Sequence, residues 1–363
     1  MYYSTDNSIN LAEEIKCWAK TNTTPTYYKL QVDDGSFVHS RIQSVIGSVV
    51  LALTSISGAW LNFLIIVALL RNSTIRKEYL TPFIISMALA DFCYSVFGLP
   101  VKSLRFQYRD WPGMSCVTYT FIGLGLWTCS AWNLLGVSMI RCIAIFKHSV
   151  TSSINFKRAS ILVIILAWIL PFALLAPTLF KKFGQFGLVC KVKFCNLINV
   201  DAKGDALAHN PEHFLGGVVV VMGVIVFLLN LATYIRVAKL SRNMAVQMGD
   251  VSKEVARKIL KKEKKVGIMM ATITTAFFLI FVSSPIFRMA DPHFELTKTR
   301  TFFWLINESI VIIDPMTYFL FQEQYRKELK RLFQTSKAQF LNFKKMTSEI
   351  KSTSGIKTET TTN

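Results

Sequence analysis

Charged residues are scarce in this chain. Asp, Glu, Lys and Arg make up 17% of its 363 residues, whereas apolar residues make up 52%. The apolar residues also stand in blocks that are too long and too seldom interrupted for the core helices of a soluble domain. The scarcity of charge therefore argues against a soluble protein and predicts an integral membrane protein.

Patterns that carry catalysis are missing as well. The sequence has no zinc-ligand spacing, no nucleophile triad and no glycine-rich loop of the kind that cradles phosphates. It also has no duplicated half, whereas many transporters are built from two related repeats. We therefore do not expect an enzyme, and a transporter or channel is the weaker interpretation of the long apolar blocks.

Acidic residues are outnumbered by basic ones, 22 to 41, which gives a formal net charge of +19. The basic residues gather between the apolar blocks and after the last one, most densely at 252–265 and 324–333, whereas the first forty residues carry more acids than bases. This distribution follows the positive-inside rule with the N-terminus outside and the C-terminus inside. Nucleic acid is not an expected partner, because no aromatic-interleaved basic fold accompanies the charge.

Seven segments are long enough to cross a hydrocarbon core of about 30 Å at about 1.5 Å per helical residue. They cover residues 43–70, 80–101, 114–146, 159–180, 214–238, 266–289 and 301–321. The sequence therefore predicts an all-α integral membrane fold, a seven-helix transmembrane bundle at 43–321. The flanking segments are predicted to be an extracellular N-terminal tail at 1–42, an amphipathic membrane-surface helix at 322–334 and a disordered cytoplasmic tail at 335–363. The N-terminal residues lack a basic segment followed by an apolar run, so we expect the first span to direct insertion.

The seven cysteines divide by depth. Three fall well inside predicted spans, where cysteine is usually a small apolar residue, and four face the oxidising space, one of them, Cys116, at the outer end of the third span. The four are Cys17, Cys116, Cys190 and Cys195. Two disulfides are expected among them, and spacing alone leaves three connectivities open.

Several polar, aromatic and proline residues stand at distinctive places in successive spans. Arg141 ends the third span, 25 residues after Cys116, and Asp91 lies in "ALADF" of the second. The other marks are Asn62, "WPGMSC" at 111–116, Trp168, Tyr234, Pro285 and "DPMTY" at 314–318. Together they resemble the rhodopsin-like (class A) G-protein-coupled receptors over almost the whole chain.

The loop "FGQFGLVCKVKFCNLI" at 183–198 narrows the resemblance. It is similar to the corresponding loop of the invertebrate Moody and Trapped-in-endoderm receptors, relatives of the melatonin-type receptors. That similarity implies a disulfide between Cys116 and Cys195 and leaves Cys17 to pair with Cys190.

Acidic side chains inside the spans need a function, because burying a charge in a bilayer is costly. Asp91 could form a hydrogen bond between helices or bind an ion. The resemblance implies that Asp314, which stands where the family has asparagine, faces Asp91, with Ser130 beside them. Two carboxylates this close cannot easily both ionise, so they are expected to share either a proton or a sodium ion.

Other candidate residues lie at the two ends of the bundle. Tyr234 and Tyr318 could be interfacial aromatics, but the resemblance implies that they swing inward and meet Arg141 on activation. Glu308 could be a ligand counter-ion or be hydrogen-bonded to a neighbour. The candidate ligand contacts are Trp304, Glu308, Gly123 and Tyr119. Gly123 stands where amine receptors carry aspartate, which argues against a simple biogenic amine as ligand.

The restraints that hold the family's arginine at rest are changed here. Ile140 replaces the preceding acid, Cys142 replaces the following tyrosine, and Lys265 occupies the position of the acid on the sixth span. Ser283 stands in place of the family's tryptophan. These changes predict that little holds Arg141 in the resting state and that ligand-free signalling is appreciable.

The resemblance implies a plasma-membrane receptor that binds an extracellular ligand and activates a heterotrimeric G protein. The coupling residues would be Arg141, Tyr234, Tyr318, Asp314 and Pro285. A receptor that scavenges ligand without signalling is the alternative that the altered arginine motif favours. Asn22 is the sequon that this topology leaves available for glycosylation, and the Ser/Thr-rich tail is expected to bind a receptor kinase and arrestin.

Overall fold

The chain is described here from a computed structural model that covers the helical bundle and a small sheet at one end of it. We call the end that carries the sheet the outer end and the opposite end the inner end. The described residues are 16–20, 28–32, 41–105, 113–146, 154–189, 194–198, 211–247, 261, 265, 267–269, 271–283, 286, 297–321, 323 and 325–334.

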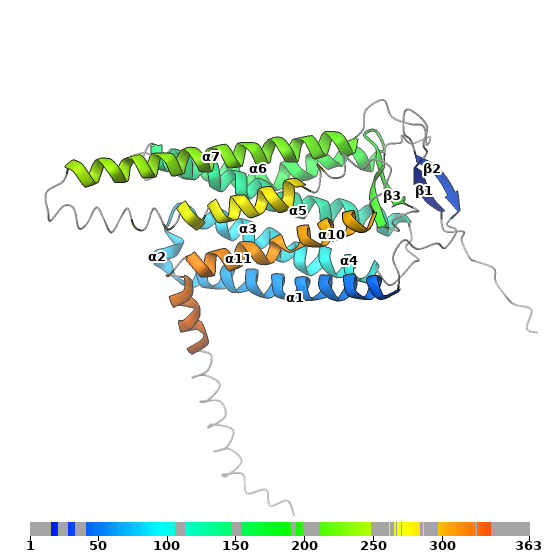
Figure 1. The fold of residues 1–363 in the computed structure, drawn as a ribbon, viewed down its shortest axis with the longest axis horizontal. Helices are drawn as coiled ribbons and strands as arrows, with labels where there is room; N and C mark the ends of the chain where they lie inside the picture. The colour runs from blue at the N-terminus through cyan, green and yellow to red at the C-terminus, as the bar shows by residue number, and fades with distance from the viewer. Residues whose placement is uncertain are drawn as a thin grey trace, which may run out of the picture.

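The apolar segments form helices that lie side by side in an elongated bundle (Figure 1). The first, third, fourth and fifth spans are α1 (Arg41–Arg71), α5 (Gly113–Phe146), α6 (Ile154–Leu179) and α7 (Pro211–Gln247). A short helix, α2 (Ser73–Arg76), follows the first span. Among the described residues, five helices are long and apolar enough to cross a membrane, and Gly267–Leu279 and Ile310–Phe321 are shorter apolar segments. These seven segments correspond to the seven predicted spans.

The second, sixth and seventh spans are not uniform α-helices. The second consists of α3 (Thr81–Cys93), the π-helical η1 (Tyr94–Gly98) and α4 (Leu99–Arg105). The sixth contains a π-helical segment, η3 (Phe277–Val282), and the seventh is divided at Ser309 into α10 (Thr297–Glu308) and α11 (Ile310–Phe321). Ser309 forms a tighter i→i−3 bond, with its N–H 3.0 Å from the Ile306 carbonyl oxygen.

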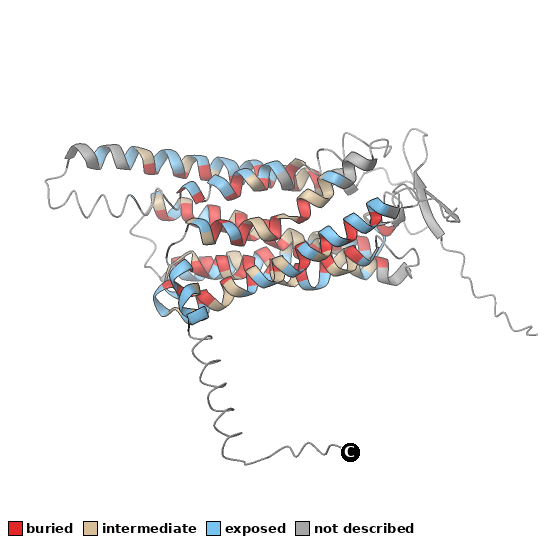
Figure 2. Cartoon of the chain, turned by 60° about the horizontal axis from the view of Figure 1, so that its bottom comes forward, coloured by how far each residue is buried: buried red, intermediate tan, exposed pale blue. Residues whose placement is uncertain are grey.

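Large apolar side chains cover the outside of the bundle, and polar side chains lie within it. On α6, Ile161, Leu162, Ile165, Leu166 and Ile169 are exposed. In contrast, the buried polar side chains include Asn62, Asp91, Asn133, Arg141, Asn230, Glu308 and Asp314. Figure 2 shows buried residues along the inner sides of the helices. This arrangement, the reverse of a soluble protein, is expected where lipid surrounds the bundle and polar groups must find partners inside it.

Hydrogen bonds between helices fix the bundle at two of the residues that carried the family resemblance. Asn62 on α1 donates to the carbonyl oxygen of Val311 on α11 at 2.9 Å. Trp168 on α6 donates to the hydroxyl of Ser86 on α3 at 2.9 Å. Such bonds connect helices for which the surrounding lipid offers no hydrophobic driving force.

A small sheet covers one end of the bundle, so the fold is not all-α as predicted. The sheet has the strand order β2-β1-β3-β4, from β1 (Lys16–Lys20), β2 (Tyr28–Val32), β3 (Gln185–Val189) and β4 (Phe194–Ile198). β3 and β4 form an antiparallel hairpin in the loop between α6 and α7, and Trp18 of β1 pairs with Val189 of β3. Phe186 and Leu197 are buried with Leu175 of α6, which gives the hairpin an apolar face against the bundle.

The disulfide between Cys116 and Cys195 joins the start of α5 to β4. Their Cα atoms are 5.6 Å apart. The predicted pairing is thereby confirmed. The second predicted pair lies outside the described side chains, since only the backbone of Cys17 is described and Cys190 falls between β3 and β4.

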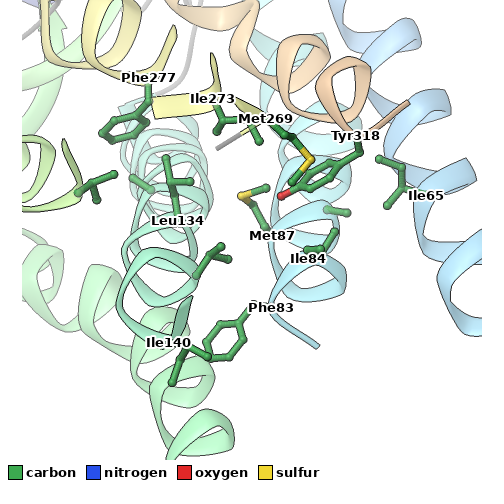
Figure 3. Packing of buried hydrophobic residues seen from close by; sticks show 14 of the residues in the cluster. Ile65, Phe83, Ile84, Met87, Leu134, Ile140, Met269, Ile273, Phe277 and Tyr318 are labelled. Atoms are coloured by element: carbon green, nitrogen blue, oxygen red, sulfur yellow. The ribbon is translucent and has the colours of Figure 1, made fainter. Parts of the chain in front are cut away.

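Apolar side chains from several helices pack together in the inner half of the bundle (Figure 3). The cluster includes Phe83, Met87, Leu134, Met269 and Ile273. Ile140 belongs to the same cluster and is buried. The residue that replaces the family's acid is therefore a packing residue here.

A helix at residues 325–334 follows α11 at the end of the bundle opposite the sheet (Figure 1). Its Tyr325 and Glu328 are buried, whereas Arg326, Lys327 and Arg331 are exposed. The side chain of Asn72, at the N-cap of α2, donates to Glu328 at 3.0 Å. The helix is therefore joined to the short turn between the first two spans.

Candidate functional site

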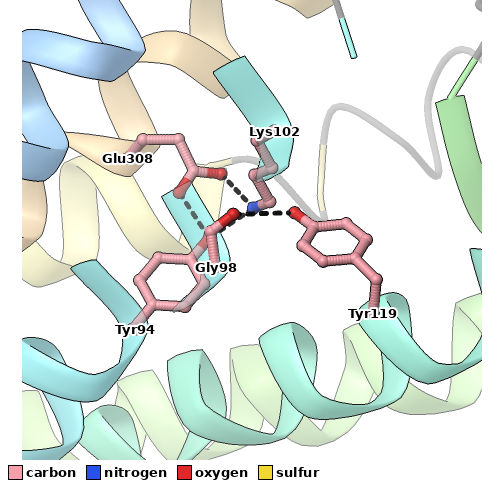
Figure 4. Close-up of polar contacts among 5 residues, drawn as sticks. All are labelled: Tyr94, Gly98, Lys102, Tyr119 and Glu308. Atoms are coloured by element: carbon pink, nitrogen blue, oxygen red, sulfur yellow. Dashed lines mark hydrogen bonds and ion pairs between the residues drawn. The ribbon is translucent and has the colours of Figure 1, made fainter. Parts of the chain in front are cut away.

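An ion pair lies in the outer half of the bundle, between the second and seventh spans. Lys102 Nζ of α4 is 2.6 Å from Glu308 Oε1 of α10, and the hydroxyl of Tyr94 donates to Glu308 Oε2 at 2.5 Å. Lys102 also donates to the hydroxyl of Tyr94 (Figure 4). The Glu308 side chain is 1% exposed and that of Lys102 is 20% exposed. We call these three residues the outer ion-pair cluster.

The π-helical turn η1 shapes the space around this cluster. A Cβ atom on Gly98 would lie 2.6 Å from the Tyr94 ring, so glycine is required for the ring to take this position. The Gly98 carbonyl accepts a hydrogen bond from Tyr119 of α5 at 3.2 Å. The outer ion-pair cluster is thus connected to the third span through a helical irregularity of a kind that often marks functional sites.

The predicted ligand contacts lie around the outer ion-pair cluster. The Trp304 ring centroid is 5.2 Å from Lys102 Nζ, and a Cβ on Gly123 would lie 3.6 Å from the Tyr119 ring. Of the two interpretations left open for Glu308, the contacts favour the one in which neighbours hold its carboxylate. A cationic ligand would have to displace Lys102 before it could pair with Glu308.

Three of the predicted polar residues come together in the middle of the bundle. Asp91 of α3 has Ser130 of α5 as a hydrogen-bonding partner and lies close enough to Asp314 on α11 for the two carboxyl groups to interact electrostatically. One carboxylate oxygen of each aspartate is buried without a hydrogen-bond partner, as are the Asn133 amide oxygen and the Tyr318 hydroxyl. Buried oxygens of this kind fit either a shared proton or a cation that prefers oxygen ligands.

Arg141 lies at the inner end of α5 and is 2% exposed. A Cβ on Gly267 of the sixth span would lie 3.7 Å from Arg141 Nη2 and 3.9 Å from Cδ2 of Tyr234. The backbone of the sixth span therefore packs against both predicted switch residues. Exposing an arginine side chain to lipid costs free energy, and the burial of Arg141 inside the bundle avoids that cost.

The two predicted switch tyrosines differ in their surroundings. Tyr234 of α7 is 48% exposed, on the outside of the bundle. Tyr318 of α11 belongs to the inner apolar cluster, and its ring centroid is 6.2 Å from that of Tyr325 in the 325–334 helix. Tyr234 is therefore half-exposed beside the sixth span, whereas Tyr318 is packed in the bundle interior.

Lys265 has an acidic neighbour outside the sixth span. A hydrogen bond and charge attraction from Lys327 hold the pKa of Glu323 below its ordinary value, and the charges of Lys265 and Arg326 lower it further. Lys265, which replaces the family's acid, thus lies close enough to be attracted by Glu323.

A second polar contact joins three spans near the inner end. The side-chain amide of Asn230 on α7 donates to Ser138 Oγ on α5 at 2.8 Å and to Thr274 Oγ1 on the sixth span at 2.9 Å. All three side chains are buried. We call these three residues the polar clasp.

Sequence reasoning missed Lys102, Tyr94 and the polar clasp. A lysine at the outer end of a span is common, so it gave no signal of an ion pair with the seventh span. For the polar clasp a local signal existed, because Ser138 lies three residues before Arg141 and Asn230 lies four residues before Tyr234. These spacings place each pair on one helix face. Pro285 and Asn22, also predicted to be functional, lie outside the described residues.

Comparison with known proteins agrees with this geometry. Residues 61–318 match the family described as "7 transmembrane receptor (rhodopsin family)". The chain is 28% identical to Protein trapped in endoderm-1 of Drosophila melanogaster, over 39% of this chain and 37% of that protein. It is 29% identical to the G-protein coupled receptor moody of Drosophila pseudoobscura pseudoobscura, over 46% of this chain and 25% of that protein.

The fold is also that of a solved receptor structure. Squid rhodopsin superposes with a TM-score of 0.68 at 16% identity, over 84% of this chain and 91% of the squid chain. The predicted resemblance to rhodopsin-like receptors, and to the Moody and Trapped-in-endoderm group in particular, is confirmed. The chain is a multi-pass membrane protein that belongs to the rhodopsin family of seven-transmembrane receptors.

Proposed function

We propose that this chain is a plasma-membrane receptor that binds an extracellular ligand at the outer end of the bundle and activates a heterotrimeric G protein at the inner end. Ligand binding shifts an equilibrium between two arrangements of the helices, and outward movement of the sixth span opens the inner face. Its ligand is not a simple amine, because Glu308 already has a positive partner in Lys102.

The observation that carries this proposal is the burial of Arg141 beside the sixth span. An arginine placed only for structure at a membrane surface would extend into water, whereas this one is 2% exposed and borders Gly267. Outward movement of the sixth span would uncover it. Arg141 would then contact the G protein, with Tyr234 and Tyr318 turning inward to support it.

Asp91, Asp314 and Ser130 form the polar hinge of the seventh span in this proposal. The unpartnered oxygens of Asp91 and Asp314 fit a sodium ion, which would be held by these two carboxyl groups with the Ser130 hydroxyl as a further ligand. A proton shared between the two carboxylates satisfies the same oxygens. Thermal unfolding in sodium chloride and in choline chloride distinguishes the two, because only a sodium site gives stabilisation that depends on the cation.

The remaining elements lie on the cytoplasmic side. The 325–334 helix carries basic residues on an exposed face and would lie along the inner membrane surface. Phosphorylation of the hydroxyl-rich tail at 347–363 by a receptor kinase would create an arrestin-binding segment, because each phosphate adds about −1.5 to −2 charges.

The proposal is tested by guanine-nucleotide exchange on purified G proteins. The receptor in lipid nanodiscs, combined with a panel of heterotrimers and a ligand library, is expected to accelerate exchange on at least one heterotrimer. Ligand binding without exchange on any of them would instead indicate the scavenging receptor that the altered arginine motif left open.

A further inference from the structure

The polar clasp connects the three spans that border Arg141. The Nδ2 group of Asn230 carries two hydrogens, and three acceptors lie within bonding distance of it: Ser138 Oγ on α5, Thr274 Oγ1 on the sixth span and, at 3.0 Å, the Val226 carbonyl oxygen of its own helix. Ser138 in turn donates to the Leu134 carbonyl of its own helix at 2.9 Å. No charged group takes part, so the contact does not depend on the ionisation of any member.

The polar clasp lies about one to two helical turns from Arg141. Ser138 precedes Arg141 by three residues on α5, and Thr274 follows Gly267 by seven residues on the sixth span. Gly267 is the residue whose backbone borders the arginine. A displacement of the sixth span that uncovers Arg141 therefore also separates Thr274 from Asn230.

We propose that the polar clasp is the restraint that holds the sixth span against α5 and α7 in the resting receptor. It acts in place of the two acids that the family uses and that are Ile140 and Lys265 here. This inference rests on the proposed function. Opening separates Thr274 from Asn230, whose amide keeps Ser138 and the Val226 carbonyl as acceptors, so the bond between α7 and the sixth span is the contribution that is lost. Asn230 is a positioning residue, because it acts on Arg141 through the sixth span.

Two substitutions remove the polar clasp in steps. Thr274→Val keeps the side-chain shape and removes one interhelical bond, and Asn230→Leu removes both. An interhelical hydrogen bond in a membrane shifts a two-state ratio by about threefold on average. We therefore expect ligand-free nucleotide exchange to rise about threefold in Thr274→Val and up to about tenfold in Asn230→Leu.

Thr233→Val is the matched control. Thr233 is buried on α7 and its hydroxyl donates at 2.8 Å to Leu229 of the same helix, so its removal breaks no contact between spans. Its exchange rate is expected to stay at the wild-type value. Adding Arg141→Ala to Asn230→Leu is expected to abolish the raised exchange.

A second readout follows the sixth span without a G protein. Spin labels are attached at Lys157→Cys on α6 and at Lys261→Cys, which are both exposed positions. Double electron–electron resonance between them reports the distance between the inner ends of α6 and the sixth span. The partly exposed Cys93 and Cys142 are replaced by alanine in this background. Asn230→Leu is expected to increase the population of long distances, and Thr233→Val is not.

The two readouts separate failure of this inference from failure of the proposed function. Longer spin-label distances in Asn230→Leu, without nucleotide exchange on any heterotrimer, would support the restraining role of the polar clasp and overturn the proposed G-protein coupling. Exchange that depends on Arg141 but is unchanged in Asn230→Leu and Thr274→Val would overturn the polar clasp. An equal rise in Thr233→Val would also overturn it, because that variant keeps both interhelical bonds.

Discussion

Replacing Lys102 by methionine removes the positive member of the outer ion-pair cluster and keeps a side chain of similar length. Glu308 would then be 1% exposed and would keep the hydrogen bond from the Tyr94 hydroxyl, since Lys102 supplies the bond to its other carboxylate oxygen. Replacing Glu308 by glutamine is milder. Lys102 is 20% exposed and can turn its ammonium group toward water when the opposite charge is gone.

The expected magnitudes follow from this difference in exposure. Leaving one member of a buried ion pair without its partner costs about 3–5 kcal/mol, so Lys102→Met is expected to lower the free energy of unfolding by that amount. Glu308→Gln is expected to lose about 1.5–3 kcal/mol, the contribution of a hydrogen bond to a charged group. The double variant contains no unpaired charge, so it is expected to be more stable than Lys102→Met alone.

Unfolding in lipid–detergent mixed micelles with increasing sodium dodecyl sulfate measures these free energies. Lys182→Met, at an exposed lysine beyond the end of α6, is the control for loss of a positive charge. A coupling free energy between Lys102 and Glu308 of at least about 1.5 kcal/mol is expected from the four-variant cycle, because the double variant is expected to lose less than Lys102→Met alone. If the two single losses add in the double variant, or if Lys182→Met loses as much as Lys102→Met, the reasoning about the outer ion-pair cluster is refuted.

Three further predictions concern other parts of the chain. Gly58→Ala places a Cβ 2.6 Å and 2.7 Å from side chains of two neighbouring spans and should lose about 1–3 kcal/mol in the same unfolding titration, whereas Gly217→Ala, with no atom within 4 Å, should not; equal losses would contradict this. Cys116→Ala removes a disulfide worth about 2–5 kcal/mol and should reduce surface expression measured by flow cytometry, and unchanged expression would argue against that role. Truncation after Met346 should reduce arrestin recruitment to the stimulated receptor in a proximity assay, and unchanged recruitment would mean that the tail only adds solubility.

The spans could be predicted because hydropathy reports where a helix crosses hydrocarbon. For the same reason it did not report where a helix ends. α7 continues to Gln247, whereas the predicted span stopped at 238, because helical hydrogen bonding does not require an apolar sequence. The break at Ser309 is marked by local i→i−3 bonds, and in the π-helical turn at Tyr94–Gly98 the Tyr94 ring lies against Gly98; hydropathy records neither feature.

The candidate site could be predicted only where a family motif marks it. Asp91, Arg141 and Tyr318 were found because their spacing matches known receptors. Lys102 and Glu308 are 206 positions apart in sequence, and no spacing rule connects them. The three members of the polar clasp are uncharged, so reasoning from the cost of burying a charge did not identify them.

The most direct test of the account is ligand-free nucleotide exchange by the wild-type receptor, Asn230→Leu and Arg141→Ala, each purified in lipid nanodiscs and combined with heterotrimers of every class. We predict exchange above that of empty nanodiscs for the wild type, faster exchange for Asn230→Leu, and background exchange for Arg141→Ala at equal amounts of folded protein. Background exchange for all three on every heterotrimer, or exchange that survives Arg141→Ala, would contradict coupling through this arginine.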